Sequence, residues 1–401
     1  MATIVMLEAL GFGVDELSRS AERRDAELVL FTFDRPYYEY GLARHDHVRV
    51  VDVDTFDIDA VRAALDSLGP VDGLISNTDT WSGHAETLAI ERGFPHVARN
   101  IALLRDKVRV RNTLFEAGLS GHRAVRASEW ADPPAGEDRS FIVKDASGTG
   151  SRHVLFAESA QDVGKRMTEL IGNGLEPEGI TVEPYFKGPL YSAETYTTAT
   201  GTTLFGVTSR TVSELPDFRE LDLSYPVGRG TPWESSVRHW VSDVLSAIGR
   251  GIGPSHVEFV DTGSGFEVVE VNCRLGGFLV GHGIELVNGL SPYDLLIGQA
   301  LAEDLDGVMG RATTPPVARA YAQVAKYAGR TGRLGTVLGT EGLRSFPGEV
   351  AWHPILRPEA TVLATDDQRS AYGLVTATGP APDEALRRAH AAARHVRIAG
   401  R

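Results

Sequence analysis

The sequence predicts a mixed α/β protein of two to three domains, and three observations support that prediction. The chain has 401 residues, which is long for one hydrophobic core. Apolar, β-branched segments alternate with helical segments over the first hundred residues, as is typical of a parallel sheet covered by helices. Later segments pair as hairpins, one across a glycine-rich loop at 147–151 and one across a turn at 262–265, so antiparallel sheets are expected there.

The composition limits the class of function. Hydrophobic residues make up 42% of the chain and charged residues 23%, which is ordinary for a soluble globular protein. Acidic residues exceed basic ones by 54 to 40, for a formal net charge of -14, which argues against nucleic-acid binding and favours small-molecule substrates. The single cysteine, Cys273, excludes an internal disulfide and fits a reducing compartment. No apolar run approaches the roughly 20 residues that span a bilayer, so we expect a cytoplasmic location and no membrane partner.

The first hundred residues are predicted to form one domain with a parallel sheet. The expected strands and helices, in chain order, are the segments 3–7, 16–24, 28–33, 47–51, 58–68, 73–76 and 84–92. The turn at Gly11 and Gly13 suggests a dinucleotide site, but Glu16 stands where the third glycine of G-x-G-x-x-G is required. A dehydrogenase is therefore a weak alternative, and it predicts NADH binding without dependence on Mg2+.

Two lysines and a glycine loop suggest polyphosphate binding. Lys107 lies near the start of a helix that is predicted to begin near Arg105. Taken alone, a solvated lysine is the better explanation, since the basic residues of this helix, Arg105, Lys107, Arg109 and Arg111, could form an exposed face. Lys144 ends the predicted strand 141–144, and the loop 147–151 follows, with backbone N–H groups that can cradle phosphates. The glycines of this loop lie between two strands, so it is not a Walker A loop, which opens into a helix.

Three oxygen ligands converge in the stretch from Gly253 to Gly277. Two antiparallel strands joined by a turn would bring Glu258 opposite Glu270, and Asn272 lies two residues further along the same face. Hard divalent cations such as Mg2+ choose carboxylate and amide oxygens. Arg274 adds a positive charge on that face, whereas any one of these residues alone would more often be a solvated surface group. Cys273 alternates with them and is expected to point away, as a packing residue.

Together these segments resemble the ATP-grasp ligases. The stretch containing Glu258 and EVNCRLGG is similar to the family signature in which a Glu, then E-x-N-x-R-x-G-G, holds two Mg2+ ions and the triphosphate. Lys107, after an aspartate, resembles the first nucleotide-contacting lysine, and the glycine loop resembles the lid hairpin. Asp145 departs from the family pattern, which usually has proline after Lys144. The resemblance implies an ATP-grasp fold, with ATP and two Mg2+ or Mn2+ ions as cofactors.

The stretch VEPYFKGPLYSAETYT resembles the hinge strand of the same family. The resemblance implies that Glu183 accepts hydrogen bonds from the adenine amino group or the ribose hydroxyls, that the backbone at Tyr185 reads the adenine edge, and that Phe186 packs on the ring. On burial tendencies alone, both aromatic residues would serve equally well in a core. Glu194 is available on the next strand. The nucleotide ligands that the resemblance implies are Lys107, Lys144, Ser147, Gly150, Ser151, Glu183, Tyr185, Phe186 and Glu194.

Two further segments are candidates for substrate contact. The polar segment 207–231 shows little periodicity and is predicted to be a loop that closes over the substrates. Its candidate residues are Arg210, Tyr225 and Arg229. In the amino-acid ligase branch of the family, the residues after the signature arginine face the substrate, which implies roles for Arg274, Gly277 and Phe278. His282 is a further candidate, although a hydrogen-bonded core histidine is the more common outcome.

The expected domains are 1–100 as an N-terminal α/β domain, 101–300 as an ATP-grasp domain with a lid at about 122–182, and 301–401 as a C-terminal domain resembling that of L-amino acid ligases. The resemblance implies an ADP-forming carboxylate–amine ligase. It would activate a small carboxylate, of an amino acid or a related acid, as an acylphosphate that an amine attacks, with Arg274 stabilising the oxyanion.

The alternatives are an ATP-grasp carboxylase, a carboxylate–thiol ligase, and a regulatory module that binds ATP without turnover. A homodimer is possible, because large α/β ligases are often dimers.

Overall fold

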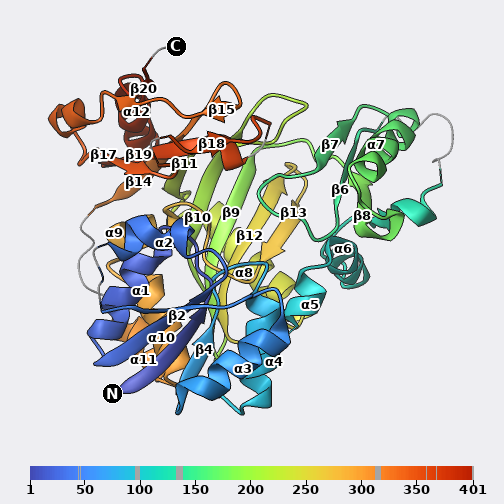
Figure 1. Ribbon diagram of the computed structural model, residues 1–401. Helices are drawn as coiled ribbons and strands as arrows, with labels where there is room; N and C mark the ends of the chain where they lie inside the picture. The colour runs from blue at the N-terminus through green and yellow to red at the C-terminus, as the bar shows by residue number, and fades with distance from the viewer. Residues whose placement is uncertain are drawn as a thin grey trace.

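The computed structural model describes residues 1–43, 45, 47–94, 100–131, 139–311, 318–357, 359–366 and 368–399, without the side chains of residues 39–41, 310 and 311. Within these residues, three sheets of four or more strands organise the chain (Figure 1). One belongs to the N-terminal part, one stands apart beside helix α7, and the largest runs through the middle of the molecule.

The N-terminal unit is built on a parallel sheet with the strand order β3-β2-β1-β4. Its elements are β1 (Ala2–Leu7), α1 (Gly13–Glu22), β2 (Ala26–Thr32), α2 (Arg35–Leu42), β3 (Arg49–Asp52), α3 (Ile58–Leu68), β4 (Gly73–Ile75) and α4 (Ser82–Glu91). Successive β1 side chains point to opposite faces, so Ile4 and Met6 pack toward α1 whereas Val5 and Leu7 pack toward α3 and α4. The predicted alternation is confirmed, and each strand boundary lies within two residues of the expected one.

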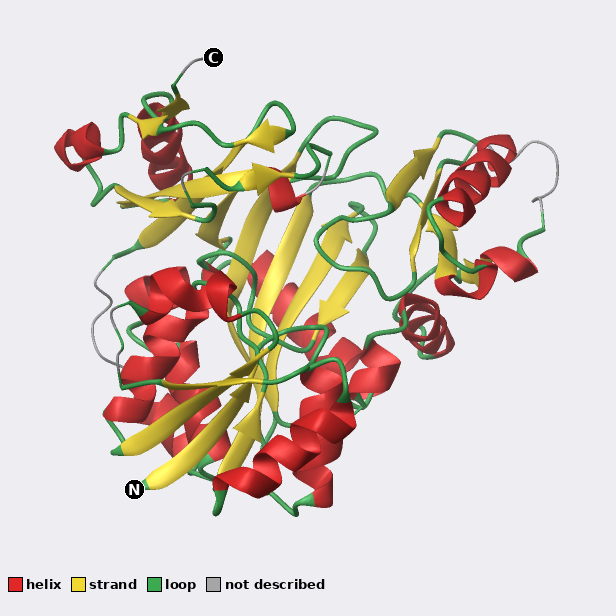
Figure 2. Cartoon of the chain, in the orientation of Figure 1, coloured by secondary structure: helices red, strands yellow, loops and turns green. Residues whose placement is uncertain are grey.

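The lid is a separate four-stranded antiparallel sheet with one long helix on it. It contains β5 (Val125–Arg126), η1 (Ala127–Glu129), β6 (Phe141–Asp145), β7 (Val154–Ala157), α7 (Ala160–Gly172), η2 (Pro177–Gly179) and β8 (Ile180–Pro184). Val143 and Val182 of the sheet bury themselves against Val163 and Leu170 of α7. The lid thus has its own small core, and the glycine loop joins β6 to β7 as predicted. Figure 2 shows this unit extending away from the central strands.

The central sheet has the strand order β13-β12-β9-β10-β11-β14-β19-β17. Its first five strands in the chain are β9 (Leu190–Thr197), β10 (Thr202–Val212), β11 (Glu220–Val227), β12 (Gly253–Asp261) and β13 (Phe266–Asn272). The helices in this part are α5 (Ile101–Leu104), α6 (Lys107–Glu116), α8 (Pro232–Ala247), α9 (Val280–Asn288), α10 (Pro292–Ala300) and α11 (Leu305–Arg311). Val237, Val241 and Val244 of α8 pack under the sheet against Val257 and Phe259.

The prediction that residues 207–231 form a loop is wrong. Most of the segment belongs to β10 and β11, which pair with each other through two register irregularities. β11 buries polar side chains, among them Glu220, Asp222 and Ser224. They alternate with Leu221, Leu223 and Tyr225, which is the period-two pattern of a strand, so the sequence did carry a local signal for β11.

The last quarter of the chain extends the central sheet. Its elements are β14 (Ala320–Tyr327), β15 (Gly332–Arg333), β16 (Val337–Leu338), η3 (Glu341–Ser345), β17 (Ala351–Pro354), β18 (Thr361–Val362), η4 (Gln368–Ser370), β19 (Ala371–Gly379), α12 (Pro382–Ala393) and β20 (Arg397–Ile398). Ala385, Ala389 and Ala392 of α12 pack against this part of the sheet. None of the helices in the described ranges is long and apolar enough to cross a membrane.

Candidate active site

The antiparallel pair β12–β13 brings the predicted metal ligands together. Glu258 lies directly opposite Glu270, and His256 lies directly opposite Asn272. The ladder carries an irregularity just after Glu258, and such bulges re-aim side chains beside functional sites. The expected arrangement of the three oxygen ligands on adjacent strands is therefore present, and His256 joins them.

Positively charged side chains lie next to the carboxylates of both Glu258 and Glu270. Burial would raise the pKa of Glu258, but Arg210 and His256 outweigh it and hold that pKa well below its usual range. The Glu258 carboxylate lies 3.4 Å from the Arg210 guanidinium and 3.2 Å from His256 Nε2. Glu270 Oε1 lies 3.0 Å from Lys107 Nζ. Glu258 is therefore ionised at neutral pH, as metal ligation requires.

This ligand set fits Mg2+ bound together with phosphate. No group of three or more His, Cys, Asp and Glu side chains in the described ranges is placed to hold a metal ion. An ion here would rest on Glu258, Glu270, the Asn272 amide oxygen and oxygens of the substrate. Mg2+ in phosphoryl-transfer sites is bound in this manner, by one or two carboxylates together with phosphate oxygens and waters.

Lys107 connects the metal strand to the glycine loop. Helix α6 starts at this residue because the Asp106 carboxylate caps the helix, accepting from Val108 N at 3.1 Å and Arg109 N at 3.2 Å. The Lys107 ammonium donates to Gly148 O at 2.8 Å as well as pairing with Glu270. The structure thus places this predicted phosphate-binding lysine between the loop and the metal ligands.

The glycine loop is held by its own side chains. Asp145, which departs from the family pattern, accepts from Ser147 N at 2.8 Å and from Ser147 Oγ at 3.2 Å. Its charge therefore stabilises the turn. Gly150 and Ser151 adopt left-handed backbone conformations, with φ of +65° and +58°. Ser151 Oγ donates to Phe218 O at 2.8 Å, so the lid loop touches the turn between β10 and β11.

A buried network of charges lies between the lid and the central sheet. The Glu183 carboxylate forms ion pairs with Lys144 and Arg111, and Arg111 also pairs with Glu267 at 3.1 Å. Lys144 Nζ reaches Val269 O on β13 at 3.3 Å. Burial would raise the pKa of Glu183, but Lys144 and Arg111 lower it. Both Glu183 oxygens are engaged by these cations, and the role of adenine or ribose acceptor that the resemblance implied stays a prediction.

Arg111 is a site residue that the sequence interpretation missed. The basic residues of its helix read as a solvated face, yet the Arg111 side chain is only 2% exposed. Its guanidinium lies 4.7 Å from the centre of the Phe186 ring, within cation–π range. Tyr185 packs edge-on against Phe156 at 5.1 Å, and its N–H donates to Ser140 O. The two hinge aromatics are thus partly buried beside the charged network.

Glu194 lies behind the metal ligands. It accepts from His256 Nδ1 at 2.9 Å and from Ser192 Oγ at 2.7 Å. Burial alone would lower the pKa of His256, but the Glu194 carboxylate raises it to about 9, so the imidazolium is charged at neutral pH. Glu194 is therefore a partner of His256, which in turn contacts Glu258, and its expected role as a nucleotide ligand stays a prediction. His256 shares a strand face with Glu258, two residues away, and that spacing could have identified it.

Arg274 joins the central sheet to the N-terminal unit. Its Nε donates to Asp79 Oδ2 at 2.5 Å, and the neighbouring Leu275 N donates to Asn77 Oδ1 at 3.1 Å. Asp79 follows β4, at the carboxyl edge of the parallel sheet. Burial would lower the pKa of Arg274, but Asp79 raises it, so the guanidinium stays charged. Sequence reasoning did not identify Asp79, because the two residues are far apart in the chain.

Three further residues, Gly277, Phe278 and His282, were predicted to contact the substrate. Gly277 and Phe278 follow Arg274 immediately, and Phe278 is partly buried against the core under α9 with φ of +53°. His282 is half-buried and packs edge-on against Tyr321 at 6.1 Å, and burial lowers its pKa; its contact with substrate stays a prediction.

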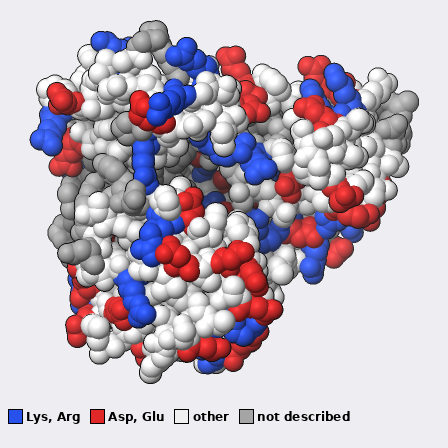
Figure 3. Space-filling view, viewed as in Figure 1, with Lys and Arg blue, Asp and Glu red and all other residues white. Residues whose placement is uncertain are grey.

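Of the three candidates from 207–231, only Arg210 lies in the site. It forms an ion pair with Glu220 in addition to its contact with Glu258. Tyr225 is buried in the core, and Arg229 bonds to the end of α9. Figure 3 shows Lys and Arg side chains gathered around the hollow between the lid and the N-terminal unit.

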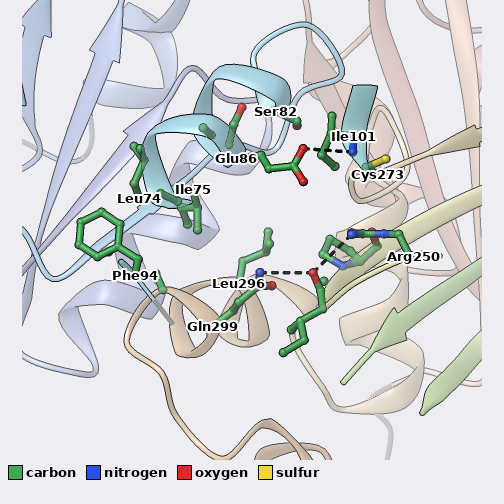
Figure 4. Close-up of a pocket in the computed structure, with 18 residues that line it drawn as sticks. Leu74, Ile75, Ser82, Glu86, Phe94, Ile101, Arg250, Cys273, Leu296 and Gln299 are labelled. Atoms are coloured by element: carbon green, nitrogen blue, oxygen red, sulfur yellow. Dashed lines mark hydrogen bonds between the residues drawn. The ribbon is translucent and has the colours of Figure 1, made fainter. Parts of the chain in front are cut away.

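A separate cavity of about 50 Å³ lies between β4, α4, α10 and the start of β12 (Figure 4). Arg250 points along its wall and donates to Pro254 O at 2.8 Å, and Glu86 accepts from Ile101 N at 3.1 Å. Cys273 lines this cavity, and burial raises the pKa of its thiol to about 12. Cys273 therefore packs in the core, as predicted.

Comparison with known proteins agrees with this architecture. Residues 326–400 match the family model described as L-amino acid ligase C-terminal domain 2. The uncharacterized protein y4rH of Sinorhizobium fredii (strain NBRC 101917 / NGR234) is 25% identical over 368 residues, which are 89% of this chain and 74% of that protein.

Solved structures extend the similarity over the whole chain. The L-amino acid ligase from Bacillus licheniformis superposes with a TM-score of 0.81 at 17% identity, covering 99% of this chain and 98% of that one. The biotin carboxylase domain of the Hydrogenobacter thermophilus 2-oxoglutarate carboxylase has a TM-score of 0.71 at 13% identity, covering 99% and 90%. The expected architecture is therefore confirmed: the chain has the ATP-grasp fold, and its C-terminal region matches the L-amino acid ligase family.

Proposed function

We propose that the protein is an ADP-forming ligase that activates a small carboxylate as an acylphosphate and joins it to an amine. One observation carries this proposal: Lys107 bridges the glycine loop and Glu270, which lies opposite Glu258. A polyphosphate in this place would meet cationic and backbone donors on one side and two metal-ligating carboxylates on the other. Arg274 lies beyond them, toward the N-terminal unit.

The chemistry follows from the difficulty of attacking a carboxylate. Its negative charge repels nucleophiles, and oxide is a poor leaving group. A carboxylate oxygen of the substrate first attacks the γ-phosphorus of ATP, and the bond to the β-γ bridging oxygen breaks to release ADP. The amine nitrogen then attacks the acylphosphate carbon, loses a proton, and displaces phosphate to leave an amide. No covalent intermediate with the protein is needed.

Each charged group of the site has a place in that scheme. Lys107 and Lys144 would offset charge on the phosphates, and Arg274 would stabilise the oxyanion that forms when the amine attacks. Glu258, Glu270 and Asn272 would hold Mg2+, which supplies charge neutralisation and alignment of the transferred phosphoryl group. The lid would exclude water, because an exposed acylphosphate hydrolyses.

Two findings support ATP and an amine acceptor. The Hydrogenobacter domain was solved in complex with MgADP, ADP and bicarbonate, which is consistent with a Mg2+–nucleotide complex on this fold. The family-model match favours amino-acid ligation. The bicarbonate in the Hydrogenobacter complex keeps a carboxylase as the second candidate, in which bicarbonate is the carboxylate.

The deciding experiment measures phosphate release from ATP with pairs of amino acids, with mass spectrometry of the product. We expect release that requires Mg2+, a carboxylate and an amine together, with stoichiometric ADP and an amide product. Separate reactions replace the amine by a thiol or supply bicarbonate as the sole carboxylate. Release with bicarbonate or a thiol, and none with any amine, would assign one of the alternatives instead.

Two variants, one inside the candidate active site and one outside it, test whether phosphate release depends on the site. Glu270→Gln removes one metal-ligating charge and should lower phosphate release at least about a hundredfold, since a single electrostatic contact of the transition state is worth about 3 kcal/mol. Glu116→Gln, on the same helix as Lys107 but with a side chain 67% exposed, should change it less than twofold. If ATP binds in the presence of Mg2+ but no substrate pair releases phosphate, the protein is a binding module.

A further inference from the structure

Three aromatic rings meet at the carboxyl edge of the N-terminal parallel sheet. Phe33 follows β2, Phe56 follows β3, and Trp81 follows β4. Their ring centroids are 5.0 Å apart for Phe33 and Phe56, 5.1 Å for Phe56 and Trp81, and 5.7 Å for Phe33 and Trp81. Phe33 is 51% exposed and Phe56 is 57% exposed. Such a cluster of exposed apolar rings commonly marks a binding surface.

Two of the loops that carry these rings are held in place by the buried carboxylate of Glu8. Glu8 is 1% exposed and adopts φ of +53°. Its Oε1 accepts from Phe33 N at 2.8 Å and from Thr55 Oγ1 at 2.8 Å. On the third side, His84 Nδ1 of helix α4 lies 3.2 Å from Thr55 O. The rings therefore stand on loops that are held in place without a ligand, which reduces the entropic cost of binding.

The position of the rings relates them to the candidate active site. In α/β sheets, ligands bind beyond the carboxyl ends of the strands. Trp81 lies two residues after Asp79, which pairs with Arg274, and the turn between them is closed by a bond from Trp81 N to Thr78 Oγ1 at 3.2 Å. Trp81 is thus two residues along the chain from the carboxylate that pairs with Arg274, the residue that the proposed function places at the reacting carbonyl.

We propose that Phe33, Phe56 and Trp81 form the subsite for an apolar side chain, aromatic or branched aliphatic, of one of the two amino-acid substrates. This inference rests on the proposed function. Aromatic rings bind apolar groups by burying area and by offset or edge-on packing of rings. A charged side chain in the same place would lose water without gaining a counter-charge from the rings.

The test compares substrates in variants that keep the fold. The double variant Phe33→Ser/Phe56→Ser removes the two exposed rings, and Ile90→Ser, at a position 54% exposed on helix α4, is the matched control. Phosphate release is measured with L-phenylalanine, L-leucine or L-alanine. We expect the double variant to lower kcat/KM about tenfold for phenylalanine and leucine, which corresponds to about 1.4 kcal/mol, because the rings no longer bury apolar area of the substrate. Its kcat/KM for alanine, and all three values in the control variant, should change less than twofold.

Calorimetric titration with L-phenylalanine, in the presence of Mg2+ and a non-hydrolysable ATP analogue, separates the two proposals. If wild type releases phosphate and the double variant keeps its preference for phenylalanine and leucine over alanine, the aromatic subsite is refuted while the ligase function stands. If no substrate pair releases phosphate but phenylalanine binds to wild type and not to the double variant, the ligase function fails and the apolar subsite stands. If no substrate pair releases phosphate and phenylalanine does not bind to wild type, both the ligase function and the apolar subsite are refuted.

A subunit interface is the competing explanation of exposed rings. Light scattering on wild type and on the double variant tests it directly. A change from dimer to monomer with an unchanged substrate preference would assign the rings to the interface and overturn the inference. The milder pair Phe33→Leu/Phe56→Leu keeps the surface apolar, so it should retain most of the activity toward leucine; a loss as large as that of the serine pair would also count against the inference.

Discussion

The buried charge network between the lid and the central sheet makes a strong prediction for Glu183→Gln. Lys144 and Arg111 carry two positive charges, and Glu183 and Glu267 carry two negative ones, so the four groups balance. Their side chains are 5%, 2%, 4% and 11% exposed, respectively. The substitution leaves one unbalanced positive charge in a place that water hardly reaches, which typically costs about 3–5 kcal/mol. We expect a loss near the lower end, because the glutamine oxygen still accepts one hydrogen bond.

Urea unfolding followed by tryptophan fluorescence measures that loss. Trp130 packs edge-on against Phe141 of the lid sheet at 5.2 Å, so it reports on the lid directly. The control is Glu169→Gln, which removes the partner of Arg166 on α7 at a position 45% exposed. Exposed pairs contribute about 0.2–1 kcal/mol. A loss below about 1 kcal/mol in Glu183→Gln would show that water screens the network, and the reasoning from burial would be wrong.

The pH dependence of stability gives an independent check on the same residue. The pKa of Glu183 is lower in the folded protein than in the unfolded chain, so the unfolded state binds the proton more readily. The contribution of Glu183 is therefore present above the ordinary carboxyl pKa and is lost as the pH falls through the lowered one. We expect the stability difference between wild type and Glu183→Gln to shrink as the pH falls from about 6 to about 3. A difference that stays constant would contradict the assigned ion pairs.

Three further predictions concern turnover. Arg274→Ala should abolish amide formation while ATP binding, measured by calorimetry, stays within about threefold; weakened nucleotide binding would place the arginine at the phosphates instead. Asp79→Asn removes the partner of Arg274 at 2.5 Å and should lower kcat about tenfold with little change in the KM for ATP, whereas an unchanged kcat would show that the pair is only structural. Ser151→Ala removes the bond to Phe218 O and should increase ADP release that is not coupled to amide formation, which is measured as the ratio of ADP to product.

Sequence patterns correctly predicted the elements that are defined by residues close together in the chain. The antiparallel placement of Glu258 and Glu270 follows from two strands and a short turn, and the structure has that register. The alternation of the first hundred residues likewise predicted a parallel sheet. These features depend on spacing within a few tens of residues, which one sequence displays.

Of two features that were missed, one depends on contacts between distant segments. The sequence favours an exposed position for Arg111, whereas in the structure it is buried and pairs with Glu183 of β8 and Glu267 of β13. Because these partners lie far away in the chain, no local pattern could reveal the burial of Arg111. The signal for β11 was local: its polar and apolar residues alternate as in a strand, and Glu220 pairs with Arg210 only ten residues earlier.

The three units meet at the site through polar contacts that cross their boundaries. Arg274 on the central part pairs with Asp79 of the N-terminal unit, Lys107 bonds to Gly148 O of the lid, and Ser151 of the lid bonds to the turn that follows β10. Each contact ties a residue with a proposed role in binding or turnover to a neighbouring unit. A movement of the lid would therefore change the position of Lys107 relative to Glu270, and a movement of the N-terminal unit would change that of Arg274. Closure around substrates would align the phosphate-binding and carbonyl-binding groups together, which links exclusion of water to the formation of a competent site.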